Sequence, residues 1–395
     1  MNQMPSVGWP PGAQLTARRP KVALIHYWLV RMRGGERVLE QVLRMFPDAD
    51  VFTHVYNPKG VSDFLRSKTI KTTFINRMPW SKRFYQRYLP LMPLALEELD
   101  LTGYDLVISF EAGPSKGVIT SPNTLHVCYC HSPMRYLWDS YGEYKAGAGA
   151  ITRSIMAPIF HFLRVWDVTT AARVDGFISN STFIRNRIEK VYRRDAVVVH
   201  PPVPVKLFQP FAEPDARFLW VGHMTSYKRP DLVVDAFNEL GLPLLMVGDG
   251  PLRKKMAARA NANIEIIPSL DFDKYRETLA RCRALVYTAE EDFGIIPVEA
   301  LAAGRPVIAY GKGGVLDTLT EFETSLFFRE QTKDALVDAV KRFEHWLPHF
   351  RPSAATTAAA RFSPEHFETQ FRAAIRAINN DRHDSVTALL DADYV

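Results

Sequence analysis

Residues 285–310, which read LVYTAEEDFGIIPVEALAAGRPVIAY, decide the fold. The apolar run 285–287 predicts a short buried strand, and the run 307–310 predicts a second one. Between them, Pro297 suits the first turn of a helix, where a missing N–H costs nothing, and Gly304 suits the position just past its end. Strand, loop, helix and strand form a βαβ unit, so the sequence predicts an α/β protein with a parallel sheet.

The predicted loop and helix carry two glutamates, Glu291 and Glu299. They follow the carboxyl end of a parallel strand, the edge where open α/β sheets bind ligands. The helix N-terminus has partial positive charge and free N–H groups that suit a diphosphate. Glu299 could then accept from ribose hydroxyls and Glu291 from a second polyol. In the alternative, Glu299 only complements the helix dipole and Glu291 is solvated; the pair with Phe293-Gly294 between them favours the ligand site.

The composition is that of a globular protein with an anionic partner. A chain of 395 residues predicts two domains, and 47% hydrophobic with 23% charged residues is ordinary. Neither a run of 18 apolar residues nor an apolar N-terminal leader is found, so we expect no transmembrane helix and no secretory signal. The net charge of +6 favours a nucleotide diphosphate, a lipid phosphate or a membrane surface. No zinc-finger or RNA-binding aromatic motif indicates nucleic acid.

The three cysteines predict no disulfide framework. Cys128 and Cys130 lie in one apolar run next to His131, a spacing too close for a usual zinc site. We therefore interpret them as core residues of a strand in a reducing compartment.

The opening stretch resembles the Glu-x7-Glu motif of retaining glycosyltransferase family 4, whose pattern is Glu-Gly-Phe-Gly-x4-Glu-Ala-x-Ala-x-Gly-x-Pro-Val. The match continues through Val307, and Asp292 stands where the pattern has its first Gly. The resemblance runs from about Lys21 to Ile378 and implies the GT-B fold, with two Rossmann-like doubly wound domains facing across a cleft. The expected boundaries are a mobile tail 1–19, an acceptor domain 20–200, a proline-rich linker 201–215, a donor domain 216–361, a helix 362–380 crossing back to the first domain, and a tail 381–395.

In the N-terminal half, a strand at 21–26, the pair Gly34-Gly35 and a helical pattern from Val38 form a phosphate-accepting arrangement. Alone this signal is weak, because glycines there also serve tight packing. The resemblance implies that Gly34 and Gly35 line the cleft near the donor diphosphate.

The run from His131 to Asp139 follows another predicted strand and resembles a subgroup of family 4 mannosyltransferases that build O-antigen and exopolysaccharide. The resemblance implies that His131 contacts the transferred sugar and that Arg135 and Asp139 lie on the acceptor side. Glu111, after the preceding strand, is a further acceptor-side candidate.

In the C-terminal half, the resemblance implies that Lys228 binds the donor diphosphate, with His223 where the family pattern Gly-Arg-x4-Lys has Arg; Arg229 is the candidate to compensate. It also implies that three further segments line the donor site. These are Gly248-Asp249-Gly250, Ser269-Leu270 and Gly313-Gly314, together with Phe293, Gly294 and Ile295 of the central motif.

Residues 68–94 alternate basic and aromatic side chains in what we interpret as a helical segment. Such a mixture suits an anionic membrane surface and equally suits a partly buried helix with solvated basic ends. We predict that this segment docks on the cytoplasmic face of the inner membrane and receives a lipid-linked acceptor.

The resemblance implies retaining transfer, with Glu291, Lys228 and His131 at the reaction centre. The subgroup favours GDP-mannose as donor and a polyprenyl-diphosphate-linked oligosaccharide as acceptor. A UDP-sugar donor, a GT-B epimerase and a non-catalytic nucleotide-sugar binder are the alternatives. No Asp-x-Asp triplet is evident as a metal-binding motif, so we predict metal independence.

Overall fold

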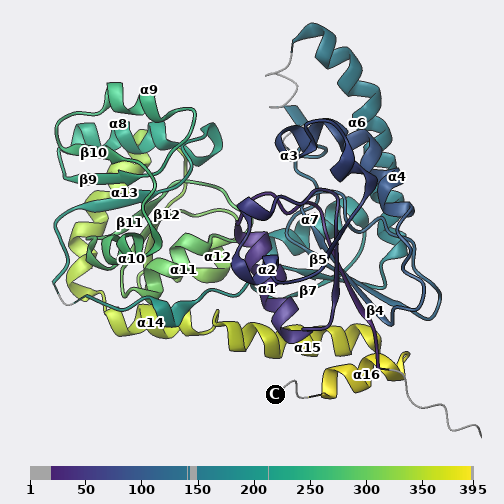
Figure 1. The fold of residues 1–395 in the computed structure, drawn as a ribbon. Helices are drawn as coiled ribbons and strands as arrows, with labels where there is room; N and C mark the ends of the chain where they lie inside the picture. Colours follow the sequence, from purple (N-terminus) through teal and green to yellow (C-terminus); the bar gives the residue numbers. More distant parts are fainter. Residues whose placement is uncertain (1–18, 140, 143–148, 212, 393–395) are drawn as a thin grey trace, which may run out of the picture.

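The structure is a computed structural model that describes residues 19–139, 141–142, 149–211 and 213–392. It contains two parallel sheets that lie side by side, each with helices on both faces (Figure 1). The predicted α/β class with two Rossmann-like domains is confirmed.

The N-terminal sheet has the strand order β3-β2-β1-β4-β5-β6-β7, and all its described pairs are parallel. Its strands are buried apolar runs, as expected for a sheet covered on both faces. They are β1 Val22–His26, β2 Asp50–Thr53, β3 Ile70–Thr72, β4 Leu106–Glu111, β5 Leu125–Cys130, β6 Gly176–Ser179 and β7 Ala196–Val198.

The C-terminal sheet has the order β10-β9-β8-β11-β12-β13. Its strands are β8 Phe218–Val221, β9 Leu244–Val247, β10 Ile264–Ile267, β11 Leu285–Tyr287, β12 Val307–Tyr310 and β13 Ser325–Phe328. In both sheets the order reverses beside the first strand, between β1 and β4 and between β8 and β11. Such switch points leave a crevice at the carboxyl ends of the strands, where α/β sheets bind ligands.

The helices of the N-terminal domain are α1 Gly34–Met45, α2 Asp63–Arg66, α3 Ser81–Phe84, α4 Met92–Glu97, α6 Ala150–Thr170 and α7 Thr182–Tyr192. The C-terminal domain has α8 Pro230–Leu240, α9 Arg253–Arg259, α10 Phe272–Arg281, α11 Ile295–Ala302, α12 Val315–Thr318, α13 Lys333–Trp346 and α14 Pro352–Ala360. Short 3-10 turns are η1 Pro58–Gly60, η2 Phe74–Arg77, η3 Tyr85–Leu91, η4 Ala171–Arg173, η5 Val205–Leu207, η6 Ser226–Lys228 and η7 Leu347–His349.

Helix α15 Pro364–Asn379 leaves the C-terminal domain and packs against the N-terminal one (Figure 1). Its buried face, with Phe367, Phe371 and Ile375, joins the core of α1 and β5. A second helix, α16 Asp384–Asp391, follows it, so the expectation of a tail from residue 381 is wrong for this stretch. Val386, Leu389 and Leu390 bury against the same core, and this apolar face stabilises the helix. Residues 1–18 of the predicted tail 1–19 lie outside the described residues.

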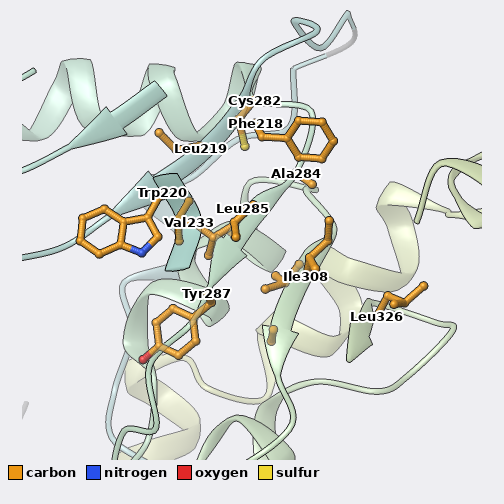
Figure 2. Packing of buried hydrophobic residues seen from close by; sticks show 14 of the residues in the cluster. Phe218, Leu219, Trp220, Val233, Cys282, Ala284, Leu285, Tyr287, Ile308 and Leu326 are labelled. Carbon is orange, nitrogen blue, oxygen red and sulfur yellow. The ribbon is translucent and has the colours of Figure 1, made fainter. Parts of the chain in front are cut away.

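The core of the C-terminal domain surrounds the stretch 285–310. Figure 2 shows Trp220, Leu285 and Ile308 packed from adjacent strands, with Tyr287 at the end of β11. Val298, Ala300 and Leu301 of α11 are fully buried in the same cluster. The loop between β11 and α11 therefore projects from a rigid support.

The segment 68–94 is not one helix, so that expectation is wrong. It is divided among β3, η2, α3, η3 and the start of α4, and Trp80 stands in the left-handed region with φ 57°. Its aromatic residues separate into two groups. Phe74, Tyr85 and Tyr88 pack inward against Ile75 and its neighbours, whereas Trp80 is 73% exposed.

Candidate active site

Two adjoining pockets lie between the β1–α1 loop and the carboxyl edge of the C-terminal sheet. The first, which we call the His223 pocket, has a volume of about 370 Å³. Its lining comes mostly from the C-terminal domain. The predicted site residues in it are Gly34, His223, Gly248, Asp249, Ser269, Leu270, Ile295 and Glu299.

The second, the His131 pocket, has a volume of about 350 Å³ and is lined from both domains. The predicted site residues in it are Gly34, Gly35, His131, Arg135, Lys228, Glu291, Phe293, Gly294 and Ile295. The two pockets share Arg33, Gly34 and Ile295. A ligand with two parts joined by a short linker fits this arrangement, because the pockets meet along one edge.

Backbone geometry places Glu291 in the His131 pocket. Gly294 precedes α11 with φ 91°, which favours glycine, and so turns the loop sharply into the helix. The Glu291 carboxylate lies 2.6 Å from Lys228 Nζ and accepts a hydrogen bond from the Tyr287 hydroxyl. Burial alone would lower the pKa of Lys228, but the adjacent carboxylate raises it above its ordinary value. Lys228 is therefore a cation at neutral pH, held where α11 begins.

Glu299 occupies the floor of the His223 pocket, and its side chain is 4% exposed. Its carboxylate accepts from the Tyr275 hydroxyl at 2.5 Å and from Arg37 of the other domain at 3.4 Å. Burial raises its pKa, and the Tyr275 and Arg37 contacts act in the opposite direction. It is thus positioned to accept from a hydroxyl in the pocket while linked to the N-terminal domain.

His131 follows β5 at the edge of the His131 pocket. Its Nε2 is buried and has no hydrogen-bond partner within the described chain. Burial lowers the pKa of His131 to about 4, so the ring is neutral at pH 7. A neutral ring with a vacant nitrogen can bind a hydroxyl of a ligand in the pocket.

Asp249 lies at the rim of the His223 pocket. Its carboxylate accepts from the Ser269 amide at 3.1 Å and from the Ser269 hydroxyl at 3.0 Å, and the amide contact lowers its pKa. These bonds join the loops that follow β9 and β10. They shape this rim of the pocket.

Several predicted site residues lie elsewhere. Glu111 is fully buried, with its carboxylate 3.1 Å from Lys116 Nζ, and it lines neither pocket, so the structure does not place it on the acceptor side. Arg229 pairs with Asp231 at 3.1 Å and lines neither pocket, so the structure does not favour it as the replacement for the Arg at the position of His223.

Three predicted glycines also lie outside the pocket linings. The Gly314 amide donates to the Glu291 carbonyl oxygen at 2.9 Å, and a side chain at Gly313 would meet the same oxygen. Gly250 lies against the backbone of Met224. At each of these glycines a Cβ would meet backbone atoms closer than 3.0 Å, so all three permit close backbone packing around the site.

Asp139 does not line either pocket; it pairs with Arg187 of α7 and lies 3.7 Å from Arg135. Arg135 faces the pocket and lies 3.7 Å from Asp292 of the other domain. The two residues thus belong to an ion-pair group that joins the domains.

Sequence reasoning missed Arg33, Arg37 and Tyr275. Arg33 and Arg37 flank Gly34-Gly35, and this proximity was the available signal. Tyr275 is a single aromatic residue on α10, and nothing in its local sequence indicates that its hydroxyl reaches Glu299.

Within the described parts of the chain, no three His, Cys, Asp or Glu side chains gather in a group that could hold a metal ion. In the same ranges no helix combines the length and apolar character needed to cross a membrane.

Two family models match adjacent parts of the chain. The model for glycosyltransferase family 4 matches residues 32–207, and the model for group 1 glycosyl transferases matches residues 206–347. Together they cover residues 32–347, which include every strand of both sheets except β1 and every lining residue of the two pockets except Tyr27.

Individual relatives match at modest identity. The alpha-1,3/1,6-mannosyltransferase of Schizosaccharomyces pombe is 24% identical over 92% of this chain and 82% of its own. An uncharacterized glycosyltransferase of Methanocaldococcus jannaschii is 27% identical over 42% of this chain and 48% of its own. An Escherichia coli O-antigen chain mannosyltransferase is 34% identical over 24% of this chain and 28% of its own. Apart from the yeast protein, the chain therefore spans about half or less of these relatives' lengths.

Among solved structures, the apo form of the lipopolysaccharide outer core galactosyltransferase WaaB aligns with a TM-score of 0.65. The alignment covers 90% of this chain and 99% of that one at 18% sequence identity, so it supports the fold alone.

Proposed function

We propose that the chain, which matches the models for glycosyltransferase family 4 and for group 1 glycosyl transferases, is a retaining mannosyltransferase of the GT-B fold that uses GDP-mannose. The observation that carries the proposal is the pair of adjoining pockets, with Glu299 in one and Glu291 in the other. A nucleotide sugar has the matching form: a nucleoside and a sugar joined by a diphosphate.

In this proposal the nucleoside occupies the His223 pocket and its ribose hydroxyls donate to Glu299. The diphosphate lies beside Lys228 and the N-terminus of α11, where cation and helix dipole favour negative charge. The sugar occupies the His131 pocket between Glu291 and the vacant Nε2 of His131. The Lys228–Glu291 pair opens to admit it, since both groups gain new partners from the ligand.

During transfer, the bond from the anomeric carbon to the phosphate oxygen breaks. The acceptor oxygen bonds to that carbon on the same face, and the acceptor proton passes to the departing phosphate. Lys228 stabilises the charge that develops on the leaving group, and Glu291 orients the sugar hydroxyls. This route needs no protein base on the reaction face, and we propose that it needs no metal ion.

Mannose is favoured because two of the relatives above are named mannosyltransferases. A UDP-sugar donor is the second candidate, because the base would lie near Ser269 and Leu270, where backbone contacts discriminate little. A thermal-shift panel of GDP, UDP, ADP and their sugars tests the donor: the largest shift with GDP-mannose supports the proposal, and the largest shift with a UDP-sugar overturns it.

Turnover separates an enzyme from an epimerase or a non-catalytic binder. We expect release of GDP from GDP-mannose to depend on a polyprenyl-diphosphate-linked saccharide and to be lost in Glu291→Ala. Binding without turnover would show a binder, and conversion of GDP-mannose without an acceptor would show an epimerase. Activity that EDTA abolishes and a divalent cation restores would contradict metal independence.

We further propose a lipid-linked acceptor and docking on the cytoplasmic face of the inner membrane through residues 68–94. Trp80 and Leu94 are 73% and 54% exposed there, beside exposed Lys82, Arg83 and Arg87. Each basic residue near an anionic membrane contributes about 1 kcal/mol. Reversing the three charges should therefore sharply reduce binding to phosphatidylglycerol vesicles. Reversal of Lys254, Lys255 and Lys341 on the other domain is the control, and equal losses in both variants would contradict the proposal.

A further inference from the structure

Asp292 differs from the family pattern, which has Gly at this position, and it makes contacts that Gly cannot. Its Oδ1 lies 3.2 Å from a guanidinium nitrogen of Arg187 and 3.7 Å from one of Arg135. Asp292 belongs to the loop after β11, whereas both arginines belong to the N-terminal domain. The contact therefore crosses the cleft directly beside Glu291.

The two arginines also meet Asp139, which pairs with Arg187 and lies 3.7 Å from Arg135. Two cations and two anions thus form one charge-balanced group, which we call the interdomain quartet: Arg135, Asp139, Arg187 and Asp292. The side chain of Arg187 is 13% exposed and that of Asp292 is 25% exposed. Arg135 and Asp139 are more open, at 33% and 45% exposed, so the contact between Arg187 and Asp292 is the one least screened by water.

Two further hydrogen bonds fix the backbone on each side of the quartet. The hydroxyl of Ser181, which caps α7, donates to the Asp292 carbonyl oxygen at 2.5 Å. Arg187 donates to the hydroxyl of Ser132 at 2.9 Å, one residue after His131. Helix α7 therefore connects the residue adjacent to Glu291 with the residue adjacent to His131.

We propose that Asp292 is a positioning residue that holds the loop of Glu291 and the loop of His131 in register across the cleft. The inference rests on the proposed function, in which these two side chains contact the transferred sugar. A carboxylate at this position attracts both arginines and, through them, segment 131–139. Without its charge, the two guanidinium groups share only Asp139, and the register between donor sugar and acceptor loosens.

The test compares wild type with Asp292→Asn in the full-length protein, using GDP-mannose and a polyprenyl-diphosphate-linked saccharide. A misplacement of about 1 Å can cost about 10²-fold in rate, so we expect the ratio of transfer to donor hydrolysis by water to fall by at least about tenfold. Hydrolysis should fall less than transfer, because it needs the donor sugar in place but no aligned acceptor, and the nucleoside contacts at Glu299 are untouched. The dissociation constant for GDP should therefore change by less than about threefold. Asp292→Glu, which keeps the charge, should restore most of the ratio.

Amide hydrogen exchange gives a readout that is independent of catalysis. The amides of His131, Leu137 and Trp138 are hydrogen-bonded within the N-terminal domain and should exchange slowly. In Asp292→Asn they should exchange faster although the substitution lies in the other domain. Asp338→Asn, which removes a carboxylate of an exposed pair on α13, is the matched control and should change neither exchange nor the transfer ratio.

Unchanged exchange and an unchanged transfer ratio in Asp292→Asn would overturn the inference. Equal losses of transfer and hydrolysis together with a lowered melting temperature would also overturn it, because they indicate general destabilisation. If wild type binds no nucleotide sugar, the proposed function fails; faster exchange of segment 131–139 would still support the mechanical link through Asp292.

Discussion

Each domain has a lysine bound to a glutamate at the same place in its sheet. Glu111 ends β4 and pairs with Lys116 at 3.1 Å; Glu291 follows β11 and pairs with Lys228 at 2.6 Å. Both strands lie beside the first strand of their sheet, where the strand order reverses. The pairs differ in burial: Glu111 and Lys116 are fully enclosed, whereas the side chains of Glu291 and Lys228 are 21% and 13% exposed.

The difference in burial gives the two glutamate–lysine pairs different surroundings. In the first domain Lys116 also binds Asp167, which accepts from the Tyr192 hydroxyl and the Trp138 indole, and together these groups close over the charges. In the second domain the pair faces a pocket, so a ligand can replace either partner. The comparison indicates that the first pair belongs to the interior of its domain, whereas the second lies where it can contact a ligand, the role proposed for it above.

The largest effect should come from Lys116→Met. It leaves Glu111 and Asp167 as enclosed carboxylates without a countercharge, a change that costs about 3–5 kcal/mol of the free energy of unfolding. Urea denaturation of Lys116→Met and of the matched variant Lys228→Met measures the difference. Lys228→Met should lose less than about 1 kcal/mol of the free energy of unfolding, because Glu291 can then be solvated through the pocket. Equal losses would break the comparison.

Next in size is Glu291→Gln. Loss of a carboxylate that orients the transferred sugar should lower kcat by about 10²-fold, equivalent to about 2.7 kcal/mol in the barrier. The amide can still accept from Lys228, so the urea midpoint should barely move. Steady-state kinetics and denaturation on the same preparation check both expectations. A variant that keeps kcat but unfolds early would assign Glu291 to the fold, as with Glu111.

The same comparison explains what could be predicted from sequence. The apolar runs, glycine turns and helical patterns predicted an α/β protein with a parallel sheet, because burial of parallel strands determines that pattern locally. The division into two such domains followed from the length of the chain and from the resemblance. The motif at 291–304 placed Glu291 and Glu299 in pockets because backbone geometry, including the turn at Gly294, fixes their positions.

The predictions that the structure does not support concern residues whose partners lie elsewhere in the sequence or in the folded loop. Glu111 ends a strand beside the cleft, as predicted, but Asp167, 56 residues later, encloses its lysine. Arg229 follows Lys228 but is held by Asp231 in a left-handed backbone conformation with φ 51°. Such pairings arise only when the chain is folded, so no local signal reports them.

The third prediction concerns which arginine replaces the one missing at His223. Sequence favours Arg229, whereas the structure favours Arg33, which reaches both pockets from the N-terminal domain. A charge-assisted hydrogen bond contributes about 1.5–3 kcal/mol, so Arg33→Gln should weaken GDP binding by at least about tenfold. Arg229→Gln should change it less than about twofold. Calorimetric titration with GDP measures both, and the reverse order would restore the interpretation from sequence.

The smallest effect follows from a buried polar residue in the first domain. His54 comes directly after β2 and is 1% exposed, with Nδ1 3.2 Å from Thr73 Oγ1 and Nε2 3.2 Å from the Pro114 carbonyl oxygen. Burial lowers the pKa of His54 from 6.5 to about 3. Below pH 6.5 the unfolded chain binds a proton that the folded chain does not, so this residue's contribution to stability is lost as the pH falls from 6.5 towards 3.

Between pH 6.5 and 5.5 that loss is about 1 kcal/mol for one such proton. Measuring the unfolding free energy of wild type and of His54→Gln at pH 6.5 and at pH 5.5 isolates the contribution of His54, because the other titrating groups are common to the two proteins. Wild type should lose about 1 kcal/mol more than the variant over this interval. The exposed His345 provides the matched substitution, and His345→Gln should show the wild-type dependence. An identical pH dependence in wild type and His54→Gln would mean that His54 binds its proton in the folded protein as well. The surroundings of His54 would then be more open to water than those of the buried Lys116–Glu111 pair.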